Sequence, residues 1–175
     1  MINKSDCLNK IYKAGFNYES NYGFCSQAVL LALSDYFDFI SEEVIKASQT
    51  LAGGGALIGD GTCGALSGGY LAIGNAFGRE KKDLGKINRD NLMKSCVLSK
   101  KLQKKFINEY DSVICNKVQK EIMGKSFDLW NPKEYKMFEE AGGHTDKCTN
   151  VTGNVAKWVA EILIENSIEV KKSKQ

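Results

Sequence analysis

Apolar residues recur at helical spacing along almost the whole chain of 175 residues, whereas the alternating pattern of β-strands is nearly absent. The only proline, Pro132, stands in the turn Trp130-Asn131-Pro132, where it can begin a helix. No low-complexity segment or linker divides the chain. The pattern predicts an all-α fold, an irregular bundle of about seven helices in a single domain that spans residues 1–175.

Local signals set the expected bounds of these helices. Gly15 is expected to stop the first helix, and Gly124 is typical of a helix C-cap. A glycine-rich loop from Gly53 to Gly61 precedes a central helix of small residues. The expected helical segments are Ser5–Ala14, Cys25–Phe39, Ser41 to the glycine cluster, Cys63–Phe77, Asp83–Tyr110, Ser112–Met123, Pro132–Glu140 and Lys147–Asn166.

Composition argues against several classes of function. The formal net charge of +3 is too small to indicate a nucleic-acid-binding protein, and only Arg79 and Arg89 are arginines among 24 basic residues. The first residues lack the apolar run of a signal peptide, and no segment approaches the length needed to cross a membrane. We therefore expect a cytoplasmic protein that binds neither nucleic acid nor a membrane.

Four of the six cysteines fall in the first turn or so of an expected helix: Cys25, Cys63, Cys115 and Cys148. A helix start has unpaired N–H groups and about half a positive charge, which favours a thiolate over a thiol. Thiolates bind metals and carry out redox chemistry. The chain contains no CxxC, so the zinc-finger and thioredoxin signatures are absent, and structural disulfides are not expected in a reducing compartment.

The ordered set Cys25, Cys63-Gly64-Ala65-x-x-Gly68, Cys115 and Cys148 resembles the C_GCAxxG_C_C family of redox-active proteins. The central segment reads Cys-Gly-Ala-x-x-Gly in this chain, whereas the family name has the first two letters in the order Gly-Cys. The segment Cys25-Ser26-Gln27-Ala28-Val29 and the run from Gly53 to Gly69 support the resemblance, which covers the chain from about Phe24 to the final helix. Related sequences include split-Soret cytochromes, which carry haem and an iron–sulfur cluster. This chain has no CxxCH, which excludes covalent c-type haem.

The resemblance therefore implies an iron–sulfur cluster, with either two or four irons, held by the four cysteines, and a role in electron transfer. Four thiolates leave either oxidised centre with a net charge of about −2. Four helix starts of about +0.5 each would offset that charge.

Two alternatives stay open. One is metal-free thiol–disulfide exchange with Cys63 as the nucleophile, and the other is a binding module closed by zinc. Whether the protein is an oxidoreductase or an accessory to one is left open.

Glycines near Cys63 allow two interpretations. Gly64, Gly68 and Ala72 recur at intervals of four and flatten one face of a helix, which predicts close helix packing. The functional alternative is that Gly61, Gly64 and Gly68 bind the cofactor by leaving room for it and donating N–H groups to sulfur. Gly59-x-Gly61-x-x-Gly64 also fits the dinucleotide fingerprint, but no strand is expected before it.

The remaining candidates are given structural or partner-binding interpretations. Cys96 is expected to be a buried inert thiol. Cys7, near the N-terminus, is expected to be incidental, and the alternative is an exposed thiol that serves as a resolving partner. His144, the only histidine, is expected to face water in a loop, and the alternative is an outer-shell donor or replacement ligand near Cys148. Lysines on the long helix predict a solvated face, with docking of an acidic ferredoxin- or flavodoxin-like redox partner as the alternative; they are Lys94, Lys100, Lys101, Lys104 and Lys105. The flat Gly/Ala helix also allows a homodimer.

Overall fold

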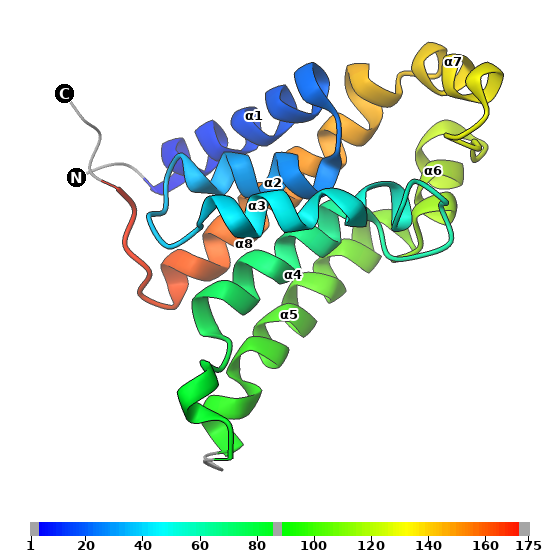
Figure 1. Ribbon diagram of the computed structural model, residues 1–175. Helices are drawn as coiled ribbons and strands as arrows, with labels where there is room; N and C mark the ends of the chain where they lie inside the picture. The colour runs from blue at the N-terminus through cyan, green and yellow to red at the C-terminus, as the bar shows by residue number, and fades with distance from the viewer. Residues whose placement is uncertain (1–3, 86–88, 172–175) are drawn as a thin grey trace.

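The computed structural model describes residues 4–85 and 89–171, which form eight α-helices and no β-sheet (Figure 1). The predicted all-α bundle is confirmed. The helices are α1 (Lys4–Tyr22), α2 (Cys25–Ser34), α3 (Glu42–Ser48), α4 (Gly64–Phe77), α5 (Arg89–Tyr110), α6 (Cys115–Met123), α7 (Pro132–Glu140) and α8 (Cys148–Glu165). A 3₁₀ turn spans Gln49–Gly54, and a π-helical turn spans Gly143–Lys147 immediately before α8.

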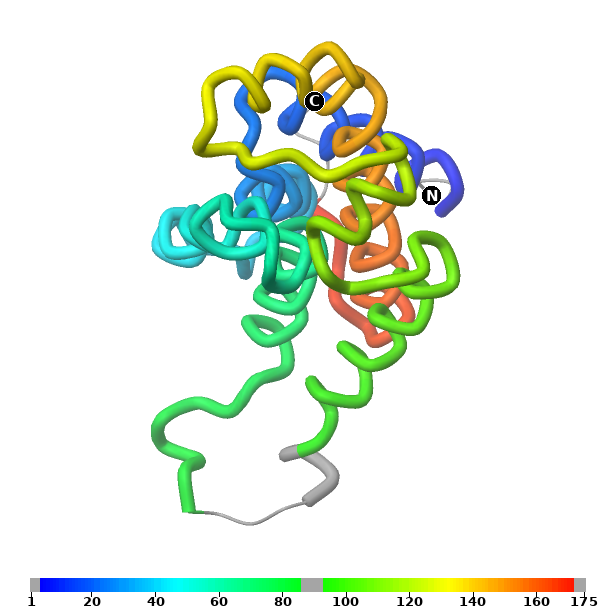
Figure 2. The backbone as a smooth tube through the Cα atoms, turned by 90° about the vertical axis from the view of Figure 1, so that its right-hand side faces the viewer, coloured from blue at the N-terminus to red at the C-terminus, as the bar shows by residue number. Residues whose placement is uncertain are grey.

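Helix α8 is the centre of the bundle, because it packs against α1, α2, α4 and α5. Its residues Val155, Val159 and Ile162 are fully buried, together with Leu102 and Phe106 of α5. Burial of such side chains contributes about 1.5–3 kcal/mol each to folding. Figure 2 shows α6 and α7 at one end of the bundle and the far ends of α4 and α5 extending from the other. Packing in the core therefore holds the first residues of α8 at the end of the bundle where α6 and α7 lie.

Gly15 does not end the first helix, contrary to the prediction. Helix α1 continues to Tyr22 because Gly15 lies at the crossing with α8, where the backbones approach closely. A Cβ at Gly15 would lie 3.2 Å from the Gly153 Cα and 3.1 Å from the Ala156 Cβ. Here glycine provides room for a neighbouring helix, and the gain from packing outweighs its poor helix propensity.

Other helix bounds agree with the prediction to different degrees. Helix α7 has the expected bounds, and Asn131 caps it by accepting hydrogen bonds from the Lys133 and Glu134 N–H groups. Helix α2 ends at Ser34 instead of Phe39, since the chain turns there and buries Phe37 in the core. Helix α5 begins at Arg89. Residues 86–88 of the helix expected from Asp83 lie outside the described residues.

The small-residue face of α4 packs closely on α2, as its spacing predicts. A Cβ at Gly68 would lie 2.5 Å from the Ser26 carbonyl oxygen, whereas a Cβ at Gly74 in the same helix would meet nothing within 4 Å. We expect Gly68→Ala to lower the free energy of unfolding by about 3 kcal/mol through overpacking. Gly74→Ala should raise it by about 0.5–1 kcal/mol. Urea unfolding of both variants tests this, and equal effects would contradict the packing described.

Candidate functional site

Each of the four predicted cysteines stands at the N-terminal end of a different helix. Cys25, Cys115 and Cys148 are the first residues of α2, α6 and α8, and Cys63 is the N-cap of α4. The starts of these helices lie together in the right-hand half of Figure 1. The placement inferred from sequence is therefore observed for all four.

A short antiparallel contact joins the segments that precede α4 and α6. Thr62 and Ile114 form an isolated β-bridge, the Cys63 N–H donates to the Val113 carbonyl at 2.7 Å, and the Cys115 N–H donates to the Gly61 carbonyl at 2.9 Å. These bonds hold Cys63 and Cys115 at the starts of adjacent helices. No alternating strand pattern predicts this single bridge.

Two glycines, Gly54 of the glycine loop and Gly64 at the start of α4, bring the backbone close to two of the cysteines. A Cβ at Gly64 would lie 2.5 Å from the Cys25 Sγ, and a Cβ at Gly54 would lie 2.9 Å from the Cys115 Cβ. Gly54 also has a φ of +80°, which few residues other than glycine adopt. Larger residues at these two positions would displace the cysteines that the glycines contact.

All four cysteines line one cavity of about 410 Å³. Cys7 and Cys96 are not among its lining residues. The other lining residues come mainly from the end of α1, the glycine loop, α6, α7 and the start of α8; they include Glu19, Phe24, Leu57, Gln119, Leu129, Tyr135, Phe138, Glu139, His144 and Thr152. Residues far apart in the chain thus surround a common chamber.

Burial keeps the four thiols protonated, which corrects the expectation that helix starts favour the thiolate here. Desolvation raises the pKa of Cys63 and of Cys115 to about 12, and the pKa values of Cys25 and Cys148 well above the usual 9.0. Negative charge on neighbouring thiols and on Glu19 raises them further. The backbone N–H groups of Ala65 and Leu66 lower the pKa of Cys63, but by less than burial raises it.

The structure adds a buried acidic residue, Glu19, that the sequence prediction missed. Burial, followed by the charge of Glu139, raises the pKa of Glu19 to about 8. Glu19 is 3% exposed and follows Ile11 and Gly15 at intervals of four on the buried face of α1. That spacing is the signal that could have identified it, because a carboxyl group on an inward face is rarely buried without a function.

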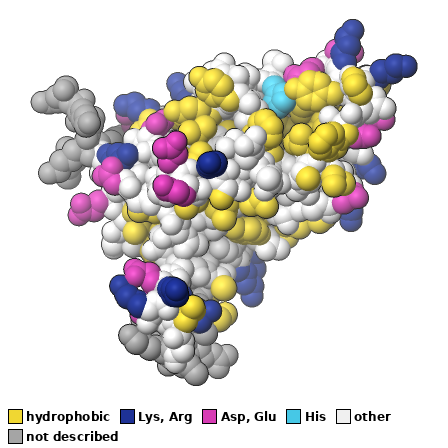
Figure 3. All heavy atoms as spheres, viewed as in Figure 1, with side chains coloured by type: hydrophobic (Ala, Val, Ile, Leu, Met, Phe, Trp, Pro, Cys, Tyr) yellow, Lys and Arg dark blue, Asp and Glu magenta, His cyan; other side chains and the backbone are white. Residues whose placement is uncertain are grey.

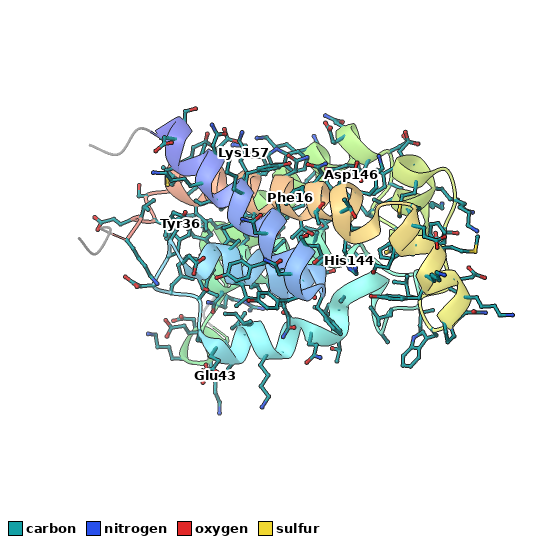
Figure 4. The ribbon with its side chains drawn as sticks, turned by 90° about the horizontal axis from the view of Figure 1, so that it is seen from above. Phe16, Tyr36, Glu43, His144, Asp146 and Lys157 are labelled. Carbon is teal, nitrogen blue, oxygen red and sulfur yellow. The ribbon has the colours of Figure 1, made fainter. Side chains whose placement is uncertain are left out.

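His144 lies in the cavity wall, beside the end of α1, and does not simply face water as predicted (Figure 4). Its Nδ1 is 2.6 Å from the Glu139 Oε1, and its Nε2 is 3.7 Å from the Glu19 Oε1. Its side chain is 23% exposed. The π-helical turn before α8 places the ring between the two carboxyl groups.

The prediction that Cys96 is buried is wrong. Cys7 is buried on the inner face of α1, whereas Cys96 is exposed on α5. The buried face of α5 carries Leu98, Leu102 and Phe106, which are spaced by four residues. Cys96 precedes Leu98 by two residues and so does not fit this spacing. The helical period therefore places Cys96 on the outer face.

The predicted cofactor-binding glycines, Gly61, Gly64 and Gly68, are not among the residues that line the cavity. Gly61 and Gly68 contact backbone of the glycine loop and of α2, and Gly64 contacts Cys25 and the Ala52 backbone. Their contacts show a packing role. Direct cofactor binding by these glycines stays a prediction.

The lysines of α5 include two that pair within the protein. The Lys101 ammonium lies 2.8 Å from the Glu165 carboxylate, and Lys105 pairs with Glu161. Lys94 lies over the Phe77 ring, with its ammonium 4.5 Å from the ring centroid. Docking of a redox partner on this face stays a prediction.

No helix in residues 4–85 and 89–171 is long and apolar enough to cross a bilayer.

Donor spacing in the cavity bears on the kind of metal centre. Within the described part of the chain, no three Cys, His, Asp or Glu side chains are grouped so that they could hold one metal ion. The four thiols instead surround a chamber. In a four-iron cluster each cysteine sulfur binds a different iron, so the ligands stand farther apart than around a single ion, whereas in a two-iron cluster two cysteines share each iron. In composition, four cysteine thiols around one chamber match the usual ligand set of an iron–sulfur cluster.

A comparison with protein families agrees with these observations. The C_GCAxxG_C_C family model, described as "Putative redox-active protein", matches residues 23–162, which include all four cavity cysteines. The chain belongs to this family. The resemblance inferred from the cysteine order is confirmed. No curated protein and no solved structure matches the chain. Redox activity is thus the family-level description of this C_GCAxxG_C_C protein.

Proposed function

We propose that this C_GCAxxG_C_C protein binds an iron–sulfur cluster through Cys25, Cys63, Cys115 and Cys148 and serves in electron transfer. The observation that carries the proposal is the shared cavity: four cysteines from separate parts of the sequence line one chamber, each at a helix N-terminus. Four cysteines are the usual ligand set of two-iron and four-iron clusters. When bound, the cluster would supply a one-electron carrier.

The surrounding chain suits a negatively charged centre. Four helix N-termini contribute about +0.5 each of partial charge, against about −2 for an oxidised cluster with four thiolates. Backbone N–H groups of Ala65 and Leu66 already favour the charged form of Cys63. Metal binding would have to displace the protons that burial keeps on the thiols, so assembly should release protons.

Anaerobic reconstitution with iron and sulfide tests the proposal. We expect a coloured protein with charge-transfer absorption in the visible range, and with iron and acid-labile sulfide in stoichiometric amounts. The electron paramagnetic resonance spectrum of the reduced protein would distinguish a two-iron from a four-iron centre. A protein that stays colourless and contains no sulfide would refute the proposal.

The same measurements separate the two alternatives. One zinc per chain without sulfide would support the zinc-closed module. A metal-free protein with a reversible disulfide between two of the four cysteines would support thiol–disulfide exchange. The pKa of about 12 for Cys63 speaks against that thiol as a ready nucleophile, because the reactive form is the thiolate.

A further inference from the structure

Large apolar side chains are exposed around the mouth of the cysteine cavity, outside the chamber itself. Three of them line the cavity, and two directly follow the lining residues Leu57 and Leu129 in the chain. Figure 3 shows hydrophobic side chains gathered around the cyan histidine on this face. We call these five residues the mouth patch; they are Tyr22, Phe24, Ile58, Trp130 and Tyr135.

The fold holds the two most exposed rings of the mouth patch in place. The Trp130 indole N–H donates to the Ala56 carbonyl at 2.8 Å, which fixes the ring against the glycine loop. The Tyr22 ring packs on the Tyr18 ring of the same helix, with 6.2 Å between the ring centroids. Aromatic side chains that are already held lose little conformational entropy when a partner binds.

The area of the mouth patch matches the apolar part of a dimer interface. Tyr22 is 70% exposed and Trp130 is 69% exposed. Together with Phe24 and Tyr135 they expose roughly 450 Å², at about 200 Å² for a whole aromatic side chain. A standard interface covers about 800 Å² per partner, of which about 65% is apolar in a homodimer, or about 500 Å². Monomers rarely expose an apolar patch of this size without a function.

Charges on α7, the helix that carries Tyr135, suit a second copy of the chain. Lys133 is in the first turn of α7 and Glu140 is at its end, and both are exposed. Within one chain the Glu140 carboxylate lies 3.8 Å from the Lys136 ammonium. Two α7 helices packed antiparallel about a two-fold axis would place Lys133 of each chain opposite Glu140 of the other. The charges beside the mouth patch are therefore self-complementary.

We propose that the mouth patch is the interface of a homodimer, in which two copies of the chain pack these residues together about a two-fold axis. The face of α4 on which the sequence allowed a homodimer is covered, because Gly64 and Gly68 are buried against α2 and the 3₁₀ turn. In the dimer the two cavity mouths face each other, and aromatic rings of each copy shield the chamber of the other from water. The interface does not depend on which cofactor the chamber holds, so it goes beyond the proposed electron-transfer function.

Sedimentation equilibrium of the full-length protein over a range of concentrations tests the interface. A thiol reductant is present throughout, so that the exposed Cys96 cannot join two chains by a disulfide. We expect a reversible equilibrium between monomer and dimer without larger species, because a two-fold interface closes after two copies. The readout is the mass of the assembly, so it is independent of iron and sulfide content. A protein that stays monomeric at every concentration would overturn the proposal.

Substitutions locate the interface. Trp130→Lys and Tyr22→Lys each put a charge into the mouth patch and should raise the dissociation constant of the dimer at least ten-fold. Val97→Lys is the matched control, because Val97 is 59% exposed on α5 and does not line the cavity. It should leave the dissociation constant unchanged, and circular dichroism confirms that the variants fold. A dimer that survives both patch substitutions, or that Val97→Lys weakens as much, would contradict the assignment.

A charge exchange tests the two-fold arrangement. Lys133→Glu places like charges opposite each other and should weaken the dimer several-fold. Adding Glu140→Lys to the same chain restores opposite charges across the axis and should recover the original dissociation constant. A double variant that is no tighter than Lys133→Glu alone would contradict the antiparallel packing of α7.

Discussion

We expect alanine at any one of positions 25, 63, 115 and 148 to remove most of the iron and sulfide that the reconstituted protein binds. Each of these cysteines lines the same cavity and begins a different helix, so no neighbouring cysteine can take its place. A cluster that lacks one thiolate loses a bond to iron and exposes that iron to solvent or thiol exchange. Iron and sulfide analysis, together with the visible spectrum of each variant, measures the effect.

The chain supplies two matched controls for this series. Cys7→Ala removes a thiol that is as buried as Cys63 and Cys115 but lies outside the cavity, so it reproduces the packing loss alone. Cys96→Ala removes an exposed thiol. Both controls should bind iron and sulfide as the unsubstituted protein does. Full cluster content in any cavity variant would exclude that residue as a ligand, and loss of iron in Cys7→Ala would mean that the readout reports stability.

Raising the pH from about 4.5 to about 8 should lower the free energy of unfolding of the metal-free protein, on the order of 4 kcal/mol, through Glu19 alone. Its pKa is raised from 4.5 in the unfolded chain to about 8 in the folded one, mainly by burial. Between these values the folded state holds a proton that the unfolded state has lost. Stability is therefore greatest below 4.5 and declines until Glu19 ionises in the folded protein.

Urea unfolding at several pH values, kept below 9 so that the thiols do not titrate, measures this slope. Glu19→Gln cannot ionise and should show a nearly flat profile over the same range. Glu140→Gln, with its exposed side chain, should keep the slope of the unsubstituted protein. Parallel profiles for Glu19→Gln and the unsubstituted protein would show that Glu19 does not ionise in the way its burial implies.

Local sequence signals predicted the helix starts well. Pro132 begins α7 and Gly124 caps the end of α6, as predicted. The order of the four cysteines also identified the family, and the fold class followed from the helical period. These features depend on residues close together in the chain, or on order alone.

Features that depend on three-dimensional neighbours were harder to predict. Gly15 was interpreted as a helix stop because the sequence does not show that α8 crosses there. The thiol pKa values were misjudged because the positive helix end is a local property, whereas desolvation depends on everything that surrounds the sulfur. His144 was placed in water for the same reason: its two carboxyl neighbours come from α1 and α7.

The distribution of the cavity cysteines over the sequence has a consequence for biosynthesis. Cys25 belongs to the second helix and Cys148 to the last, and α8 packs against the helices that carry Cys25 and Cys63. A nascent chain on the ribosome cannot complete the chamber until the final helix has emerged and docked. The complete set of four cysteines is therefore assembled only after the last helix of the chain has been synthesised, whatever the cofactor that it holds.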